Sequence, residues 1–173
     1  MQFKQAAQTE IEKNVHNAMT KLAADKTINI KLADLHVTKV KTIAVPNHKT
    51  ACVIYVPCNE IATFKQDEHL VAALEKQIVG HQVHIVADRK IEHRTPKGYR
   101  AFCKTSVDVH ANLLEDLVAP AYIAGKRIQY SAGQKLNKFL VAKVRKAEVE
   151  NRVAVCSKVY EALTGIKNQI DFM

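Results

Sequence analysis

The chain has 173 residues and a mass of 19.4 kDa, a size typical of one domain or of two very small ones. Apolar residues make up 47% of it, with five glycines and four prolines, which excludes a disordered or fibrous chain. Its longest apolar runs, over 51–57 and 117–124, are far shorter than the ~20 residues that span a bilayer. Because the N-terminus is polar, unlike a signal peptide, we expect a soluble intracellular protein with no membrane partner.

The net charge of +9 is concentrated in the middle of the chain. Residues 89–146 hold 13 basic and 4 acidic side chains, which accounts for the whole imbalance, whereas residues 1–88 carry +1 and residues 147–173 carry −1. Self-repulsion of this size is tolerated most easily when a polyanion neutralises it. Nucleic acid is the first such partner to consider. An anionic membrane surface, an acidic protein and a lysine-rich face kept for solubility are the alternatives.

The four cysteines favour reduced thiols over a metal site or a redox motif, because no two of them form a CxxC pair. Cys52 lies in an apolar strand-like run and Cys156 on the apolar face of a helix, where a cysteine behaves as a small buried hydrophobe. His81 and His84 are three residues apart but belong to no four-ligand set. We therefore predict no metal and no other cofactor.

The first half of the chain predicts a helix, a pair of strands, a second helix and a third strand. Thr9 and Glu12 have the spacing of a capping box, and the apolar residues after them repeat at helical intervals. The strands are rich in Val, Ile and Thr, and the second helix, capped by Asn59 or Asp67, stops at Gly80. In chain order the elements are a helix over 10–24, strands over 35–45 and 49–56, a helix that ends before Gly80, and a strand over 81–87.

The second half predicts an exposed basic loop, a helix, a hairpin and a final helix. The loop contains Thr-Pro-Lys-Gly, a turn-forming set, and the next helix is capped by Thr105 or Ser106 and ended by Pro120. On that helix the face formed by Val107, Ala111, Leu114 and Leu117 is expected to be buried. The elements are the loop over 89–105, the helix from 106, strands over 123–130 and 135–144 joined by the turn 131–134, and a helix over 147–164 that stops at Gly165.

Together these elements predict one α+β domain over residues 1–173. We expect a mixed sheet with a strand-helix-strand unit over 49–88, a basic hairpin toward the C-terminus, and flanking helices.

The motifs of common enzymes are missing from the sequence. The glycines have neither GxGxxG nor GxxxxGK[ST] spacing, and there is no GxSxG or HExxH segment. Glu115 and Asp116 are adjacent, so they diverge on a helix, and we expect both to be solvated rather than to share a proton. The sequence therefore predicts no enzyme, no catalytic residue and no small-molecule substrate.

Basic side chains interleaved with aromatic ones form two candidate RNA-binding sets. Arginine binds phosphate bidentately and lysine binds it as a point charge, while Tyr99, if exposed, can stack on an unpaired base; pinning of the loop to the core by Tyr99 and Phe102 is the equally weighted alternative. No acidic residue occurs from 126 to 146, and strand alternation lets Arg127 and Gln129 share one face of the hairpin with Lys138. The first set is Arg89, Lys90, Arg94, Lys97, Tyr99, Arg100 and Lys104. The second is Lys126, Arg127, Lys138, Lys143, Arg145 and Lys146, with Lys135 in the same stretch.

Three segments resemble one known family. They are the helix-Gly-strand segment over 74–91, the run Glu-Asp-Leu-Val over 115–118 that continues to Gly-Lys-Arg-Ile over 125–128, and Val-Tyr-Glu-Ala-Leu-Thr-Gly over 159–165. With these blocks the chain, over roughly residues 10–172, resembles the eukaryotic small-subunit ribosomal protein S-seven family.

The resemblance implies a structural component of the small ribosomal subunit that binds ribosomal RNA, contacts neighbouring ribosomal proteins and supports subunit assembly. It also implies a cytoplasmic location on the ribosome, with assembly in the nucleolus, and neither catalysis nor a cofactor. The alternative from the residues alone is a regulatory protein-binding module that uses its basic face for an acidic partner. A binding isotherm at several salt concentrations distinguishes the two interpretations, because binding through phosphates depends steeply on salt and does so for unrelated RNAs alike.

Overall fold

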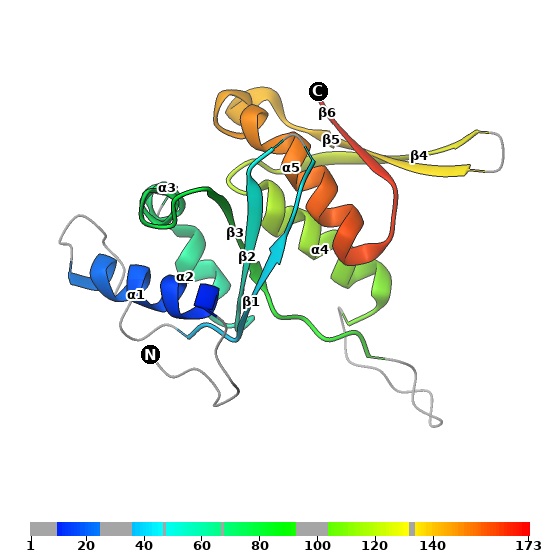
Figure 1. Cartoon of the computed structure of the whole chain (residues 1–173). Coiled ribbons are helices and arrows are strands. Elements are labelled where there is room, and N and C mark those ends of the chain that lie inside the picture. Colours follow the sequence, from blue (N-terminus) through cyan, green and yellow to red (C-terminus); the bar gives the residue numbers. More distant parts are fainter. Residues whose placement is uncertain (1–9, 25–35, 47, 67, 93–103, 132–133) are drawn as a thin grey trace. The chain divides into compact units, whose positions relative to one another are not determined.

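The computed structural model describes residues 10–24, 36–46, 48–66, 68–92, 104–131 and 134–173 (Figure 1). The chain divides into two compact units, residues 1–88 (unit 1) and 89–173 (unit 2), and each is considered by itself. Both units combine helices with a small sheet, which confirms the predicted α+β class. The predicted strands belong to two three-stranded sheets. Whether the chain behaves as a single domain stays a prediction.

Unit 1 contains the predicted strand-helix-strand crossover. Its strands have the order β1-β2-β3, with β1 antiparallel and β3 parallel to the central β2. The connection from β2 to β3 contains two helices where the sequence predicted one. The elements are α1 (Glu10–Ala24), β1 (Lys39–Ile43), β2 (Thr50–Val56), α2 (Ile61–Gln66), α3 (Glu68–Gln77) and β3 (His81–Ala87).

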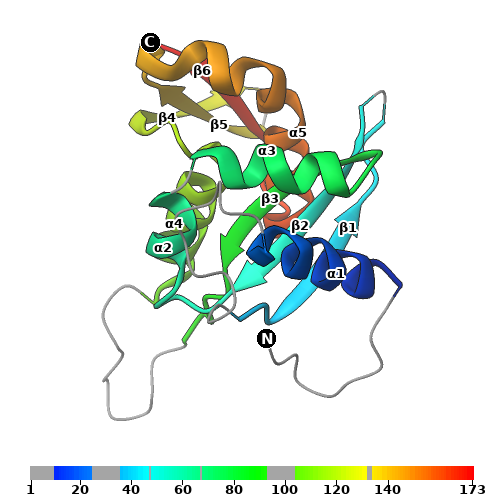
Figure 2. The same cartoon turned by 90° about the vertical axis from the view of Figure 1, so that its left-hand side faces the viewer.

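The core of unit 1 lies between its sheet and helices α1 and α3, which cover one face of the sheet (Figure 2). Val15 and Met19 of α1 are fully buried, as helical spacing predicts, and they join Leu70 and Leu74 of α3 in this cluster. The backbone of Gly80 has a φ of 88°, a left-handed conformation that glycine adopts without strain, and it turns the chain from α3 into β3.

Unit 2 contains the predicted helix, hairpin and final helix, together with a strand that the sequence analysis did not identify. Its strands have the order β4-β5-β6, with β4 antiparallel and β6 parallel to the central β5. The elements are α4 (Ser106–Val118), β4 (Ile123–Ser131), β5 (Gln134–Val141), the 3-10 helix η2 (Lys143–Arg145), α5 (Lys146–Thr164) and β6 (Asn168–Phe172).

Helix α4 begins where the sequence predicted and buries part of the predicted face. The Thr105 hydroxyl accepts a hydrogen bond from the Asp108 amide at 3.1 Å, which confirms it as the N-cap. The prediction that Val107 is buried is wrong, because its side chain is 66% exposed. Leu114 and Leu117 are buried as predicted, while Val109 and Val118 are buried in addition, so the buried stripe is rotated away from Val107.

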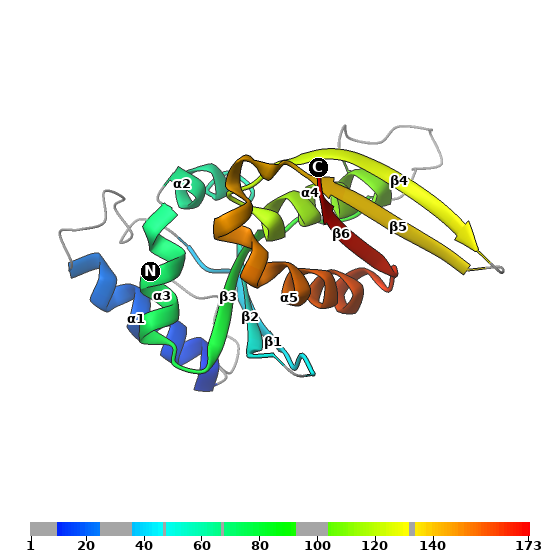
Figure 3. The ribbon, with the colours of Figure 1, turned by 90° about the horizontal axis from the view of Figure 1, so that it is seen from above.

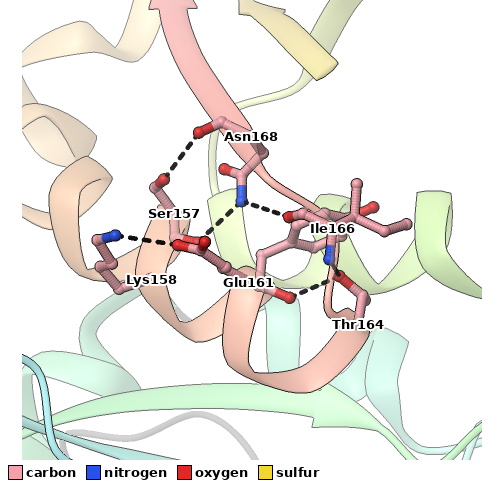
Figure 4. Close-up of polar contacts among 7 residues, drawn as sticks. Ser157, Lys158, Glu161, Thr164, Ile166 and Asn168 are labelled. Carbon is pink, nitrogen blue, oxygen red and sulfur yellow. Dashed lines mark hydrogen bonds and ion pairs between the residues drawn. The ribbon is translucent and has the colours of Figure 1, made fainter. Parts of the chain in front are cut away.

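Polar side chains at the end of α5 connect that helix to β6 (Figure 4). The Asn168 side-chain amide donates to the carbonyl of Ser157 at 3.0 Å and to that of Ile166 at 3.4 Å. The Thr164 hydroxyl accepts from the Ile166 amide, and Gly165, with a φ of 71°, is the left-handed C-cap of α5. These contacts reverse the chain so that β6 pairs with β5.

The predictions for two of the cysteines are confirmed. Cys52 of β2 and Cys156 of α5 are buried free thiols, and burial raises the pKa of each to about 11. The thiol of Cys156 donates to the carbonyl of Leu117 on α4 at 3.2 Å. Cys103 lies outside the described residues.

Because the pKa of Cys156 is raised in the folded state, its neutral form contributes stability below pH 9 that is lost as the pH rises through about 11. Between pH 8 and pH 10.5 we expect this thiol to account for about 2 kcal/mol of the fall in the free energy of unfolding. Urea unfolding at the two pH values should show a smaller fall in Cys156→Ala than in the parent. The matched control is Cys58→Ala at an exposed thiol, which should leave the fall unchanged. An equal fall in all three proteins contradicts the prediction.

Candidate nucleic-acid interface

The positive charge of the chain lies in unit 2. Unit 1 has 10 basic and 9 acidic residues, whereas unit 2 has 16 basic and 8 acidic residues, a net charge of +8. Unit 2 is therefore the place to look for a surface that binds a polyanion.

The β4–β5 hairpin presents part of this charge on one face. Arg127 and Lys138 are directly paired across the two strands, so their side chains share a face, as the sequence predicted. The neighbouring positions of β5, Asn137 and Phe139, are buried and lie on the opposite face. Seen from above, the hairpin extends past the ends of α5 and β6 (Figure 3). Lys138 pairs with Gln169 of β6, so Arg127 and Lys138 lie where the hairpin runs beside β6, and the hairpin continues beyond them.

The pairing of Arg127 with Lys138 is electrostatically unfavourable in the isolated protein. Like charges directly opposite on antiparallel strands destabilise the pair. Within the residues that the structure describes, no carboxylate contacts either side chain, and the same is true of Lys135 and Lys143. We refer to Arg127, Lys135, Lys138 and Lys143 as the hairpin cations. Within the described residues, the fold supplies no carboxylate that neutralises these four cations.

Lys143 and the other members of the second set, Lys126, Arg145 and Lys146, occupy three different settings. Lys126 lies on the other face of the hairpin, with its ammonium 5.6 Å from the ring centroid of Phe139. Lys143 was predicted on a strand, but β5 ends at Val141, and Lys143 begins the 3-10 helix η2. Arg145 and Lys146 start α5 and make partly exposed ion pairs with carboxylates one turn along it, at 3.6 and 3.4 Å. Exposed ion pairs of this kind contribute little to stability.

Arg89 of the first set is held inside unit 2. Its guanidinium pairs with the carboxylate of Asp116 on α4 through Nη1 to Oδ2, with Nη2 3.5 Å from Oδ1. The Asp116 side chain is 1% exposed. The prediction that Asp116 is solvated is therefore wrong: although adjacent to exposed Glu115, it points into unit 2 and is neutralised there. An RNA-binding role for Arg89 stays a prediction. In the structure its guanidinium is the counter-ion of the buried Asp116 carboxylate.

The rest of the first set is partly described. Lys90 is exposed. Lys104 contacts Glu92 through an ion pair at 2.5 Å, and the Glu92 amide donates to the Lys104 carbonyl at 3.0 Å, which joins the two ends of the predicted basic loop. The remaining members lie outside the described residues: Arg94, Lys97, Tyr99 and Arg100.

Comparison with known proteins places this architecture in a family. The family model of ribosomal protein S7e matches residues 1–172. The chain is 33% identical over 177 residues to the small ribosomal subunit protein eS7 of Spodoptera frugiperda, with 96% of this chain and 93% of that protein covered. It is 35% identical over 165 residues to the eS7 protein of Drosophila melanogaster, with 90% and 84% covered.

The chain belongs to the ribosomal protein S7e family.

Membership in the S7e family confirms the resemblance found in the sequence. The Caenorhabditis elegans eS7 protein is 32% identical over 167 residues, so similar proteins come from distant animals. These relatives are named as ribosomal proteins, and the family is one of structural ribosomal proteins rather than enzymes. The prediction that the chain is not an enzyme is therefore confirmed.

Elsewhere the described residues show little that suggests another chemistry. A recess in unit 1 between α1 and the turn from α3 to β3 is lined mainly by the carboxamides of Asn14, Asn17 and Gln77 together with Lys21 and His81, a set without a carboxylate or thiol. Among the described residues no three His, Cys, Asp or Glu side chains gather in a way that suits a metal ion. In the same residues no helix is both long and apolar enough to cross a membrane.

Sequence reasoning missed one exposed aromatic side chain of the hairpin. Tyr130 is 73% exposed at the far end of β4, and Ile128, two residues earlier on the same face, is 46% exposed. The signal was present as the alternation of Ile128 and Tyr130 with Arg127 and Gln129. The alternation fixes the face of Ile128 and Tyr130, but it does not show whether another element covers that face.

Proposed function

We propose that the protein is a structural constituent of the small ribosomal subunit, that it binds ribosomal RNA through unit 2, and that it supports assembly of the subunit. Membership in the S7e family supports the ribosomal role. Neighbouring small-subunit proteins are its other partners, the cytoplasmic ribosome is its location, and assembly takes place in the nucleolus.

The observation that carries RNA binding is the like-charge pair of Arg127 and Lys138 across the two strands of the β4–β5 hairpin. An acidic residue at one of these two positions would make the free protein more stable, since opposite charges across strands are favourable. RNA phosphates supply the missing negative charge, and each contact releases condensed counterions into solution. The unfavourable pair in the free protein then becomes a favourable phosphate clamp in the complex.

The hairpin cations carry the interface in this proposal, together with Arg145 and Lys146 at the start of α5 and Lys90 and Lys104 at the ends of the basic loop. Arg94, Lys97, Tyr99 and Arg100 remain proposed contacts. Guanidinium groups hold phosphate bidentately and ammonium groups hold it as point charges, so this surface binds the RNA backbone without reading sequence.

Salt titration of RNA binding tests the proposal. With about six phosphates engaged, the logarithm of the association constant should fall against the logarithm of salt concentration with a slope of roughly −4 to −5. The measurement uses fluorescence anisotropy of the full chain with a small-subunit ribosomal RNA fragment and with an unrelated structured RNA of equal length. Similar steep slopes for both RNAs are expected. A shallow slope, with tighter binding to a glutamate-rich peptide than to either RNA, contradicts the proposal and favours a module for acidic protein partners.

A further inference from the structure

We infer that Tyr130 is a stacking platform for an unpaired RNA base, with Lys135 beside it on the same face of the β4–β5 hairpin and the Arg127–Lys138 pair on the other face. The inference rests on the proposed RNA binding and adds to it a base-contacting residue outside both predicted sets.

The face of the hairpin that bears Tyr130 changes from core to surface along its length. At the near end, Phe139 packs edge-on against Tyr160 of α5, with ring centroids 5.7 Å apart. Further along, Ile128 is opposite Asn137, and at the far end Tyr130 is opposite Lys135. The hairpin as a whole extends past α5 (Figure 3), and along this face burial falls from Phe139, which is 3% exposed, to Tyr130, which is 73% exposed. On the far half of this face Ile128 and Tyr130 are therefore exposed, with Lys135 beside Tyr130.

The ring of Tyr130 is available on its faces. In three other places a lysine ammonium lies over an aromatic ring, at 4.3 Å for Tyr55 and 5.6 Å for both Phe139 and Phe172. Within the described residues no such contact, ring pair or hydrogen bond engages Tyr130. Stacking of another planar group on the face of such an exposed aromatic ring is energetically favourable, because it removes apolar surface from water.

The charges around the ring identify that group. The neighbours of Tyr130 on the hairpin are cations, with Lys135 opposite it and with Arg127 and Lys138 on the other face, and the sequence from 126 to 146 has no acidic residue. A planar ligand in a polyanionic chain is a nucleobase, and it offers its face only when it is unpaired. Lys135 is then placed to hold a phosphate of the strand whose base lies on Tyr130.

The test compares binding of a 12-nucleotide single-stranded RNA with binding of a 12-base-pair RNA duplex. Tyr130→Thr removes the ring but keeps a strand-favouring side chain. It should weaken binding of the single strand by about 5- to 150-fold, leave duplex binding unchanged, and leave the salt slope unchanged. Lys135→Ala, in contrast, should reduce the salt slope by about 0.7. Tyr130→Phe keeps the ring and should bind the single strand as the parent does.

Intrinsic fluorescence gives a second measurement, because the chain has five tyrosines and no tryptophan. Part of the tyrosine emission should be quenched by the single strand in the parent, and the quenched part should be smaller in Tyr130→Phe, where only Tyr99 among the proposed contacts still carries a tyrosine ring. Tyr122→Ala, at another tyrosine of unit 2 that is 61% exposed, is the matched control and should bind both RNAs as the parent does.

The outcomes separate the inference from the proposed function. If the parent binds both RNAs with steep salt dependence and Tyr130→Thr binds the single strand equally well, base stacking is wrong and RNA binding stands. The same conclusion follows if Tyr130→Thr loses affinity equally for both RNAs, or if Tyr122→Ala loses as much as Tyr130→Thr. If the parent binds neither RNA, the proposed function fails and the inference fails with it.

Discussion

Replacing Arg89 with alanine is expected to lower the free energy of unfolding by about 3–5 kcal/mol, because the substitution removes the guanidinium that pairs with the buried carboxylate of Asp116. Urea unfolding followed by circular dichroism measures this change. The matched control is Lys104→Ala, which breaks an ion pair whose two side chains are 47% and 42% exposed. That control should cost less than about 1 kcal/mol.

A double variant separates the structural role of Arg89 from its predicted role in RNA binding. Arg89→Met with Asp116→Leu removes both charges together and should recover most of the lost stability, since replacing a buried ion pair by apolar groups is often close to neutral. RNA binding by this folded double variant then reports whether Arg89 contacts phosphate. A loss of under 1 kcal/mol in Arg89→Ala itself would show that the buried pair does not stabilise unit 2.

Replacing Arg127 with glutamate is expected to change RNA affinity and stability in opposite directions. The substitution turns the Arg127–Lys138 pair into an ion pair across the strands, so the free energy of unfolding should rise by up to about 1 kcal/mol. It also removes a phosphate ligand and adds a repulsive charge, so the dissociation constant for RNA should rise at least about 10-fold. Anisotropy titrations at several salt concentrations and urea unfolding measure the two effects.

The matched control for Arg127→Glu is Lys41→Glu, which makes the same change of net charge at an exposed strand position of unit 1. A general electrostatic effect weakens RNA binding equally in both variants, whereas the proposed interface weakens it mainly in Arg127→Glu. If Arg127→Glu binds RNA as tightly as the parent does, the hairpin is not the interface. If it is also less stable than the parent, then the like-charge pair was not unfavourable.

The features that the sequence predicted correctly depend on neighbouring residues. The cap at Thr105 is set within one turn, and the left-handed conformations of Gly80 and Gly165 follow from the absence of a Cβ where helices end. The hairpin was predictable for the same reason, because a short turn between two alternating segments fixes its register and therefore the shared face of Arg127 and Lys138.

The features that were missed depend on residues far apart in the chain. Strand β6 is five residues long with polar Gln169 and Asp171 in it, and it is held by parallel pairing with β5 about thirty residues earlier. The local sequence indicates that Asp116 lies on the surface, and its burial is explained only by the contact with Arg89, 27 positions away. On α4 two apolar stripes are possible, and packing against α5 buries the one that leaves Val107 in solvent.

The candidate interface also combines features that the sequence predicted with features that depend on distant parts of the chain. Charge counting located unit 2 and the hairpin, because an excess of cations survives any arrangement of the chain. It did not separate Lys126 from Arg127 and Lys138, since the face of a strand residue depends on which partner is buried, here Phe139 against α5. Nor did it find Tyr130, because exposure at the far end of a strand depends on where the covering helix stops.

Sedimentation of a cell lysate on sucrose gradients at low and at moderate salt tests the ribosomal role most directly, with this protein detected in every fraction. We predict that it migrates with the small subunit and with polysomes, and that it stays there at moderate salt. Recovery of the protein in the light fractions alone, in a gradient where the subunit peaks are intact, would contradict the assignment of a structural role in the small ribosomal subunit.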